Sequence, residues 1–150
     1  MWDEITIREA LMSDLDALLP LVDAYRAFYK QESDLESTRS FMRNRLQSPM
    51  TNVFLAEGKF GIVGFAQVFE TYSTVRLAPM FILEDLFVDP QQRGAGVGTA
   101  LLQRVVEFAK KRGAGGMFLE TAHDNETAQR VYDRAGWTRE TEFYKYNAPL

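Results

Sequence analysis

Residues 88–102 read Val-Asp-Pro-Gln-Gln-Arg-Gly-Ala-Gly-Val-Gly-Thr-Ala-Leu-Leu, which predicts a strand end, a loop and a helix in succession. The apolar strand ends before Pro90, because proline has no N–H for a sheet ladder. Gly94, Gly96 and Gly98 then lead into an amphipathic helix. Small residues let the backbone approach a ligand closely, and a helix start offers unpaired N–H groups to an anion. The stretch therefore predicts a loop that binds a pyrophosphate.

The spacing of the three glycines decides which kind of loop this is. A dinucleotide-binding fingerprint needs Gly-x-Gly-x-x-Gly, whereas the glycines here stand two residues apart. A P-loop needs Gly-Lys followed by Ser or Thr, and the chain contains no such triplet. The pattern present is Arg93-x-x-Gly96-x-Gly98 after a strand. The alternative is a strand–helix connector whose glycines only permit a tight turn.

Hydrophobic periodicity divides the rest of the chain into strands and helices. Strands are expected at 5–8, 53–56, 62–71, 81–88 and 117–121, and helices at 14–28, 35–46, 97–112 and 125–135. A final hairpin is expected around Arg139 and residues 143–146. The order is βααβββαβαββ, which predicts an α/β fold with a mixed central sheet and helices on both faces.

This order and the glycine loop resemble the GNAT superfamily of N-acetyltransferases. Arg93-x-x-Gly96-x-Gly98 is similar to its acetyl-coenzyme A motif. Residues 121–128 resemble the strand-to-helix segment whose asparagine contacts the coenzyme arm, a place held here by Asn125. Residues 131–137 resemble the Tyr-x-x-x-Gly-Phe/Trp signature, whose tyrosine lies near the thioester sulfur and is Tyr132 here.

A finer resemblance concerns the acceptor. Residues 83–88 resemble a strand of diamine (spermidine/spermine) acetyltransferases, which has a Glu-Asp pair like Glu84-Asp85. Residues 25–29 and 72–74 resemble fungal histone and polyamine acetyltransferases. The resemblance implies one N-acetyltransferase domain over residues 1–150, a splay between the fourth and fifth strands, and a homodimer.

The chemistry of amine acetylation explains the need for acidic residues. A primary amine has a pKa near 10.4, so keeping it neutral at pH 7 costs about 4–5 kcal/mol. A carboxylate can bind the ammonium and then accept its proton, directly or through water. Successive strand residues point to opposite faces unless a bulge intervenes. By resemblance we expect Glu84 to be the base and Asp85 to support it or bind the amine, with Asp85 or water as alternative bases.

The remaining expected roles concern the donor. A phenol near pKa 10 can protonate a leaving thiolate, and Tyr132 is the candidate. The resemblance implies that a backbone N–H near Leu86 binds the thioester carbonyl oxygen and that Phe87 and Val88 line the pantetheine arm. Arg93 could add a charge to the phosphates, or could be an ordinary surface arginine. The N–H groups expected to hold the pyrophosphate belong to Gly94, Ala95, Gly96, Val97, Gly98 and Thr99.

Composition excludes several other classes. The chain has 150 residues, a net charge of −4, a pI of about 5.1 and no cysteine, so we expect neither a disulfide framework nor an acyl-cysteine intermediate. No basic stripe favours nucleic acid, and no apolar run is long enough to cross a membrane. Residues 1–4 are acidic and precede no apolar run, so we expect no signal peptide and a cytoplasmic protein. His123 is the sole histidine, and we expect no metal site.

These observations lead to one functional hypothesis and two alternatives. The chain is expected to transfer an acetyl group from acetyl-CoA directly to the primary amine of a small, cationic, polyamine-like acceptor. Tyr25, Phe28, Tyr29 and Tyr72 are candidate walls of the acceptor site, although they could equally be packing residues. The enzymatic alternative is acetylation of a protein lysine or an amino acid. The other alternative is a non-catalytic module that senses acetyl-CoA.

Overall fold

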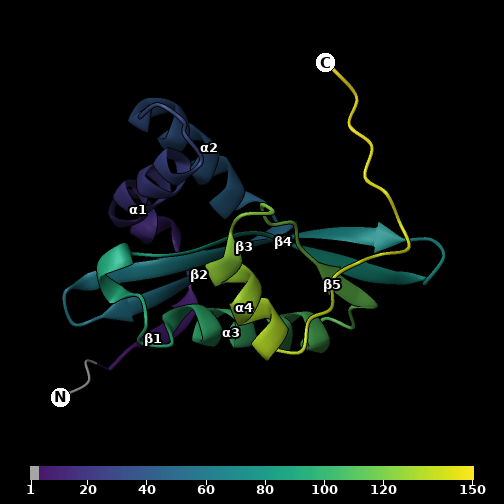
Figure 1. Cartoon of the computed structure of the whole chain (residues 1–150). Coiled ribbons are helices and arrows are strands. Elements are labelled where there is room, and N and C mark those ends of the chain that lie inside the picture. The colour runs from purple at the N-terminus through teal and green to yellow at the C-terminus, as the bar shows by residue number, and fades with distance from the viewer. Residues whose placement is uncertain (1–3) are drawn as a thin grey trace. The chain divides into compact units, whose positions relative to one another are not determined.

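The computed structural model describes residues 4–150 as two compact units, 4–120 and 121–150, and each is described by itself (Figure 1). Residues 1–3 lie outside the described part. The expectation that there is no signal peptide rests on residues 1–4 and therefore concerns mainly these residues. The first unit contains β1 (Thr6–Glu9), η1 (Met12–Asp14), α1 (Leu15–Phe28), α2 (Leu35–Gln47), β2 (Thr51–Gly58), β3 (Gly61–Ser73), β4 (Ala78–Val88), η2 (Pro90–Gln92), α3 (Val97–Lys111) and β5 (Gly116–Phe118). The second unit contains α4 (Glu126–Arg134). No helix in residues 4–150 has the length and apolar character needed to cross a membrane.

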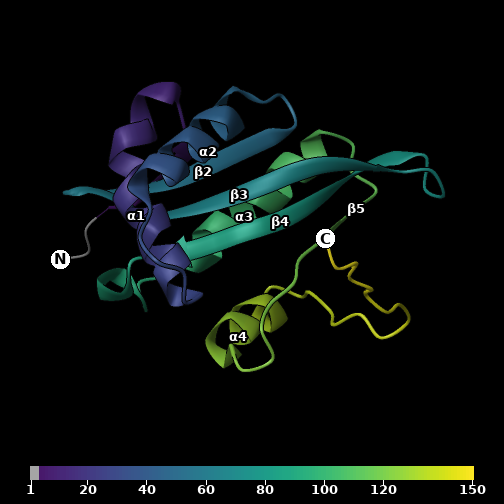
Figure 2. The same cartoon turned by 90° about the horizontal axis from the view of Figure 1, so that it is seen from above.

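One mixed sheet organises the first unit. Its strands lie in the order β1-β2-β3-β4-β5, antiparallel from β1 to β4 and parallel between β4 and β5. Helices α1 and α2 cover one face of this sheet and α3 covers the other, as Figures 1 and 2 show. The predicted α/β class, the mixed sheet and the helices on both faces are therefore confirmed.

Each face of the sheet has its own apolar core. On the α3 face, the ring of Phe108 makes T-shaped contacts with Phe54 at 5.3 Å and with Phe81 at 5.5 Å between centroids. On the α1 face, a buried cluster joins the inner side of α1 to residues of all three central strands. The residues of this cluster are Leu15, Leu18, Leu19, Leu21, Val22, Met42, Val53, Leu55, Phe65 and Phe87.

A β-bulge at Glu84 separates the two halves of β4. Val68 of β3 pairs with Leu83, and the preceding residue Gln67 pairs with Asp85, so Glu84 is an extra residue on β4. Without the bulge, residues six apart such as Phe81 and Phe87 would lie on the same face. Instead, Phe81 contacts α3 and Phe87 contacts α1. The bulge therefore reverses the alternation and turns Asp85 and Phe87 toward α1.

The predicted final hairpin is wrong. No strand follows α4 within the described residues, and residues 137–150 have no regular structure apart from a bend. The intervening Glu140-Thr141-Glu142 contains no glycine or asparagine, which a three-residue hairpin loop favours at its left-handed position. The aromatic residues of the segment are exposed, with Tyr144 at 91% and Tyr146 at 90%. The alternation that suggested a strand thus lacks both a turn and a pairing partner.

Candidate active site

The glycine loop between β4 and α3 has the conformation expected of an anion-binding loop. Gly94 and Gly96 adopt φ of 88° and 78°, which L side chains rarely adopt, and no atom lies within 4 Å of where a Cβ would stand. Gly96 is the N-cap of α3, and no side chain caps this helix. The N–H groups of Val97, Gly98 and Thr99 therefore point out of the first turn with no partner in the helix. Such a turn attracts an anion.

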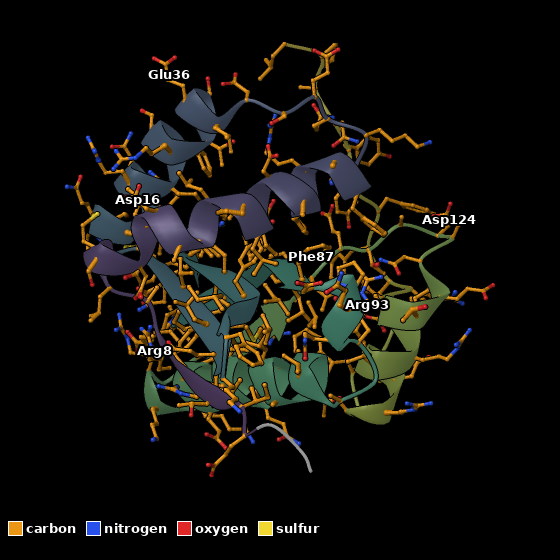
Figure 3. All side chains as sticks on the ribbon, turned by 90° about the vertical axis from the view of Figure 1, so that its left-hand side faces the viewer. Arg8, Asp16, Glu36, Phe87, Arg93 and Asp124 are labelled. Atoms are coloured by element: carbon orange, nitrogen blue, oxygen red, sulfur yellow. The ribbon has the colours of Figure 1, made fainter. Side chains whose placement is uncertain are left out.

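Arg93 lies beside the end of β4. Its guanidinium carbon stands 5.6 Å from the ring centroid of Phe87, and its Nε donates to the carbonyl oxygen of Val88 at 3.3 Å (Figure 3). The side chain is thus held by a cation–π contact and one hydrogen bond, which leaves the other guanidinium N–H groups for a ligand. Arg93 therefore lies against Phe87 and Val88, two of the other expected coenzyme-binding residues.

Within residues 4–120, the edge of β4 that faces β5 has no strand beside it beyond Ile82. Within residues 4–120, β5 pairs only with Met80, Phe81 and Ile82. On the other edge, the N–H of Asp89 donates to Val63 of β3 at 2.8 Å. Since alternate residues of an antiparallel strand point their N–H groups to opposite sides, the N–H of Leu86 points away from β3. This splay agrees with the expected one and leaves the Leu86 N–H without a ladder partner in this unit.

The two acidic residues of β4 differ in environment. Glu84, the bulge residue, is exposed, whereas Asp85 is half-buried on the α1 face. Oδ2 of Asp85 accepts a hydrogen bond from Nε2 of Gln67 at 2.5 Å. Burial raises the pKa of the Asp85 carboxyl, while hydrogen bonds from Gln67 and Tyr25 lower it in part. Burial, followed by the charge of Asp85, raises the pKa of the Tyr25 hydroxyl.

Tyr25, which hydrogen-bonds this carboxyl group, belongs to an aromatic cluster. The ring of Tyr25 makes T-shaped contacts with Phe65 at 5.6 Å, with Phe87 at 5.5 Å and with Tyr29 at 5.2 Å between centroids. Phe28 contacts both Tyr29 and Phe87, and it is 50% exposed, so the cluster reaches the surface at the end of α1. Three of the four predicted walls of the acceptor site therefore lie together.

Sequence reasoning misplaced one residue of this site and missed another. Tyr72 is 67% exposed and pairs with Pro79 at the far end of the β3–β4 hairpin, so it is not part of the cluster. Gln67, which was missed, is only 2% exposed and holds the Asp85 carboxyl. The sequence does indicate a role for Gln67, because it is the sole polar residue in the apolar run 62–69. A buried amide in such a strand requires hydrogen-bond partners.

The second unit holds the remaining expected residues. Asn125 is the N-cap of α4, and its side-chain oxygen accepts from the N–H of Ala128 at 3.3 Å. This bond fixes the amide and leaves its NH₂ group as a donor for a ligand. The ring of Tyr132 lies 6.0 Å from that of Trp137, and the N–H of Trp137 donates to the carbonyl of Tyr132 at 3.0 Å. Gly136 permits this return of the chain, with φ of 87°.

No group of three or more His, Cys, Asp or Glu side chains in residues 4–150 is arranged to hold a metal ion. Within residues 4–120, the candidate site offers backbone N–H groups, the carboxyl groups of Glu84 and Asp85, the amide of Gln67, the guanidinium of Arg93 and aromatic rings. These groups can bind an anion at the glycine loop and a cation at Asp85.

Comparison with known proteins gives one consistent result. The model of the acetyltransferase (GNAT) family matches residues 16–137. An uncharacterised N-acetyltransferase of Bacillus subtilis, YhfO, is 37% identical over 142 residues and covers 95% of each chain. The crystal structure of a probable acetyltransferase superimposes with a TM-score of 0.91 at 34% identity, covering 97% of both chains. An aminoglycoside N-acetyltransferase in complex with CoA has a TM-score of 0.85 at 20% identity, covering 100% of this chain and 98% of its own, and shares the fold.

Proposed function

The chain belongs to the acetyltransferase (GNAT) family, and we propose that it transfers an acetyl group from acetyl-CoA directly to a primary amine of a small, cationic acceptor. N-acetyltransferases of this family use acetyl-CoA, which supplies the activated acetyl group as a thioester. The family match spans both compact units, which supports one catalytic domain over residues 1–150. A polyamine-like acceptor, a homodimer and a cytoplasmic location belong to the same proposal.

The observation that carries the proposal is the uncapped glycine loop at the end of β4. Its open space at Gly94 and Gly96 and its unpaired N–H groups fit a pyrophosphate, which is doubly charged and rich in acceptor oxygens. In the proposal, the N–H groups of residues 94–99 hold the pyrophosphate and Arg93 adds a positive charge. Phe87 and Val88 line the pantetheine arm, and the Leu86 N–H is aimed at the thioester carbonyl oxygen.

The acceptor amine must lose a proton before it can attack. In the proposal Asp85 binds the ammonium, and the exposed Glu84 takes the proton directly or through water. Asp85 supports this division because it is held in place by Gln67 and Tyr25 and has no ion-pair partner within residues 4–150. Asp85 itself or solvent are the alternative bases, and the acceptor residues Tyr25, Phe28 and Tyr29 contribute apolar surface.

Two residues of the second unit complete the proposed chemistry. The hydroxyl of Tyr132 donates a proton to the leaving thiolate. The amide NH₂ of Asn125, whose oxygen is fixed by its role as N-cap, hydrogen-bonds the coenzyme arm.

The decisive experiment follows thiol release by the purified chain from acetyl-CoA with a panel of amines. The panel contains spermidine, a lysine-containing peptide, free amino acids and simple alkylamines. Turnover with spermidine or an alkylamine supports the proposal, and turnover restricted to the peptide or to amino acids favours the enzymatic alternative. Tight binding of the coenzyme without turnover of any amine favours a sensor, and absence of coenzyme binding refutes the proposal altogether.

A further inference from the structure

Gln67 presents an acceptor atom whose partner is missing from the fold. Its side chain is only 2% exposed, and its Oε1 is buried without a hydrogen-bond partner among the described residues. Buried carbonyl oxygens in native proteins are almost always paired, because an unpaired one loses its bonds to water. An orphaned acceptor on the side chain that holds Asp85 therefore calls for a ligand that donates.

Asp85 fixes the orientation that leaves this oxygen unpaired. Nε2 of Gln67 donates to Oδ2 of Asp85 at 2.5 Å, so the amide nitrogen must face the carboxyl group. The opposite orientation would set the amide oxygen against a carboxylate, and two acceptors repel. The orphan is thus a consequence of holding Asp85, and Oε1 lies on the same side chain that contacts the carboxyl group.

The surroundings select a cation that carries N–H groups. Asp85 supplies a negative charge with no ion-pair partner within residues 4–150, and Oε1 of Gln67 supplies a second acceptor beside it. Tyr25 hydrogen-bonds Asp85 and its ring contacts Phe87, and aromatic rings attract cations and accommodate alkyl chains. A primary ammonium has three N–H donors, enough for both acceptors, whereas a quaternary ammonium has none.

We propose that Gln67 and Asp85 together form the ammonium-recognition site of the acceptor, with one ammonium N–H donated to Oε1 of Gln67 and another to the Asp85 carboxylate. This inference rests on the proposed function and identifies the ammonium group as the part of the substrate that the site recognises. It selects primary alkylammonium groups over quaternary ones and over uncharged alcohols. Gln67 becomes a specificity-determining residue that touches the acceptor, in addition to positioning Asp85.

The first test uses the unaltered chain saturated with CoA and three probes of equal chain length, n-butylammonium, butyltrimethylammonium and 1-butanol. NMR titration of the ¹⁵N-labelled protein gives the affinity of each probe. We expect n-butylammonium to bind at least about tenfold more tightly than butyltrimethylammonium, because only the former donates charge-assisted hydrogen bonds. Equal or tighter binding of the quaternary probe overturns the proposal, since an aromatic cluster alone would accept it.

The second test separates direct contact from positioning. Gln67→Met keeps the volume but removes both polar atoms, and it should weaken n-butylammonium at least about fivefold while changing butyltrimethylammonium less than about twofold. Asp85→Asn should weaken both cations, because it removes the charge. If Gln67 acts only by holding Asp85, Gln67→Met weakens both cations equally, and that result refutes the contact.

Asp16→Asn is the matched control. It also removes one negative charge, but at an exposed position on α1, the helix that covers the face of the sheet where Asp85 lies. It should leave all three probes unchanged. The affinity of each variant for CoA and its circular dichroism verify the fold. Thiol release by the unaltered chain is measured separately, so that failure of the ammonium site is distinguishable from failure of acetyl transfer.

Discussion

Replacing either of two glycines at opposite ends of α3 should distinguish a binding loop from a mere connector. Gly96 precedes the helix with φ of 78°, and Gly113 follows it with φ of 74°. Neither has an atom within 4 Å of where a Cβ would stand. Gly96→Ala and Gly113→Ala therefore introduce the same backbone strain with no steric clash, and they differ only in the end of the helix that they affect.

The expected magnitudes follow from this geometry. Holding alanine at positive φ costs about 1–2 kcal/mol, so both variants should lose a similar free energy of unfolding. At position 96 the methyl group also stands in the open space beside the N–H groups of Val97 and Gly98. If the backbone instead relaxes toward negative φ, these N–H groups turn away. Either outcome should weaken CoA binding at least about tenfold, or about 1.4 kcal/mol.

Urea denaturation measures the free energy of unfolding, and isothermal titration calorimetry measures the dissociation constant for CoA. We expect equal loss of stability in the two variants and weaker CoA binding in Gly96→Ala alone. Equal CoA affinities in both variants would show that the glycine loop only connects β4 to α3, and the proposed pyrophosphate site would then be wrong.

Three further predictions concern the acidic pair and the proposed acid. Tyr132→Phe should lower kcat about 10²-fold or more with little change in CoA affinity, and unchanged kcat in steady-state assays would remove its role as the acid. Glu84→Gln should flatten the rise of rate with pH below the amine pKa; an intact profile would shift the base to Asp85 or water. Because burial raises the pKa of Asp85 above its ordinary 3.8, its contribution to stability is present below that value and lost as pH rises through the folded pKa. Asp85→Asn should therefore be more stable than the parent at pH 7, with the gain in free energy of unfolding vanishing below pH 3.8.

The parts of the fold that sequence reasoning predicted well are governed by local rules. The apolar face of α3 follows from helical periodicity, and Val97, Leu101 and Val105 are all buried as that periodicity requires. The end of α4 follows from one glycine with positive φ at Gly136. In each case the residues that decide the conformation are neighbours in sequence, so the chain itself contains the information.

The site depended on pairing between strands, which no single segment encodes. Asp85 faces α1 because Glu84 is an extra residue opposite Gln67 and Val68, and the position of that bulge depends on the register between β3 and β4. Alternation alone left the faces of the two acids open. The final hairpin failed for a related reason, since Tyr144 and Tyr146 flank the polar Lys145 but no strand pairs with them in the described part.

The bulge also explains how the α3 face of the sheet stays apolar while the α1 face has a polar site beside its own apolar core. Before Glu84, Phe81 and Leu83 are buried, and Phe81 packs against Phe108 of α3. After Glu84, the same alternation would have turned Asp85 into that apolar core, where an unpaired carboxylate is very costly. The extra residue instead turns Asp85 toward the amide of Gln67 and the hydroxyl of Tyr25. The α3 face therefore remains apolar. The free-energy cost of burying the Asp85 carboxylate arises on the α1 face, where a cationic ligand can offset it.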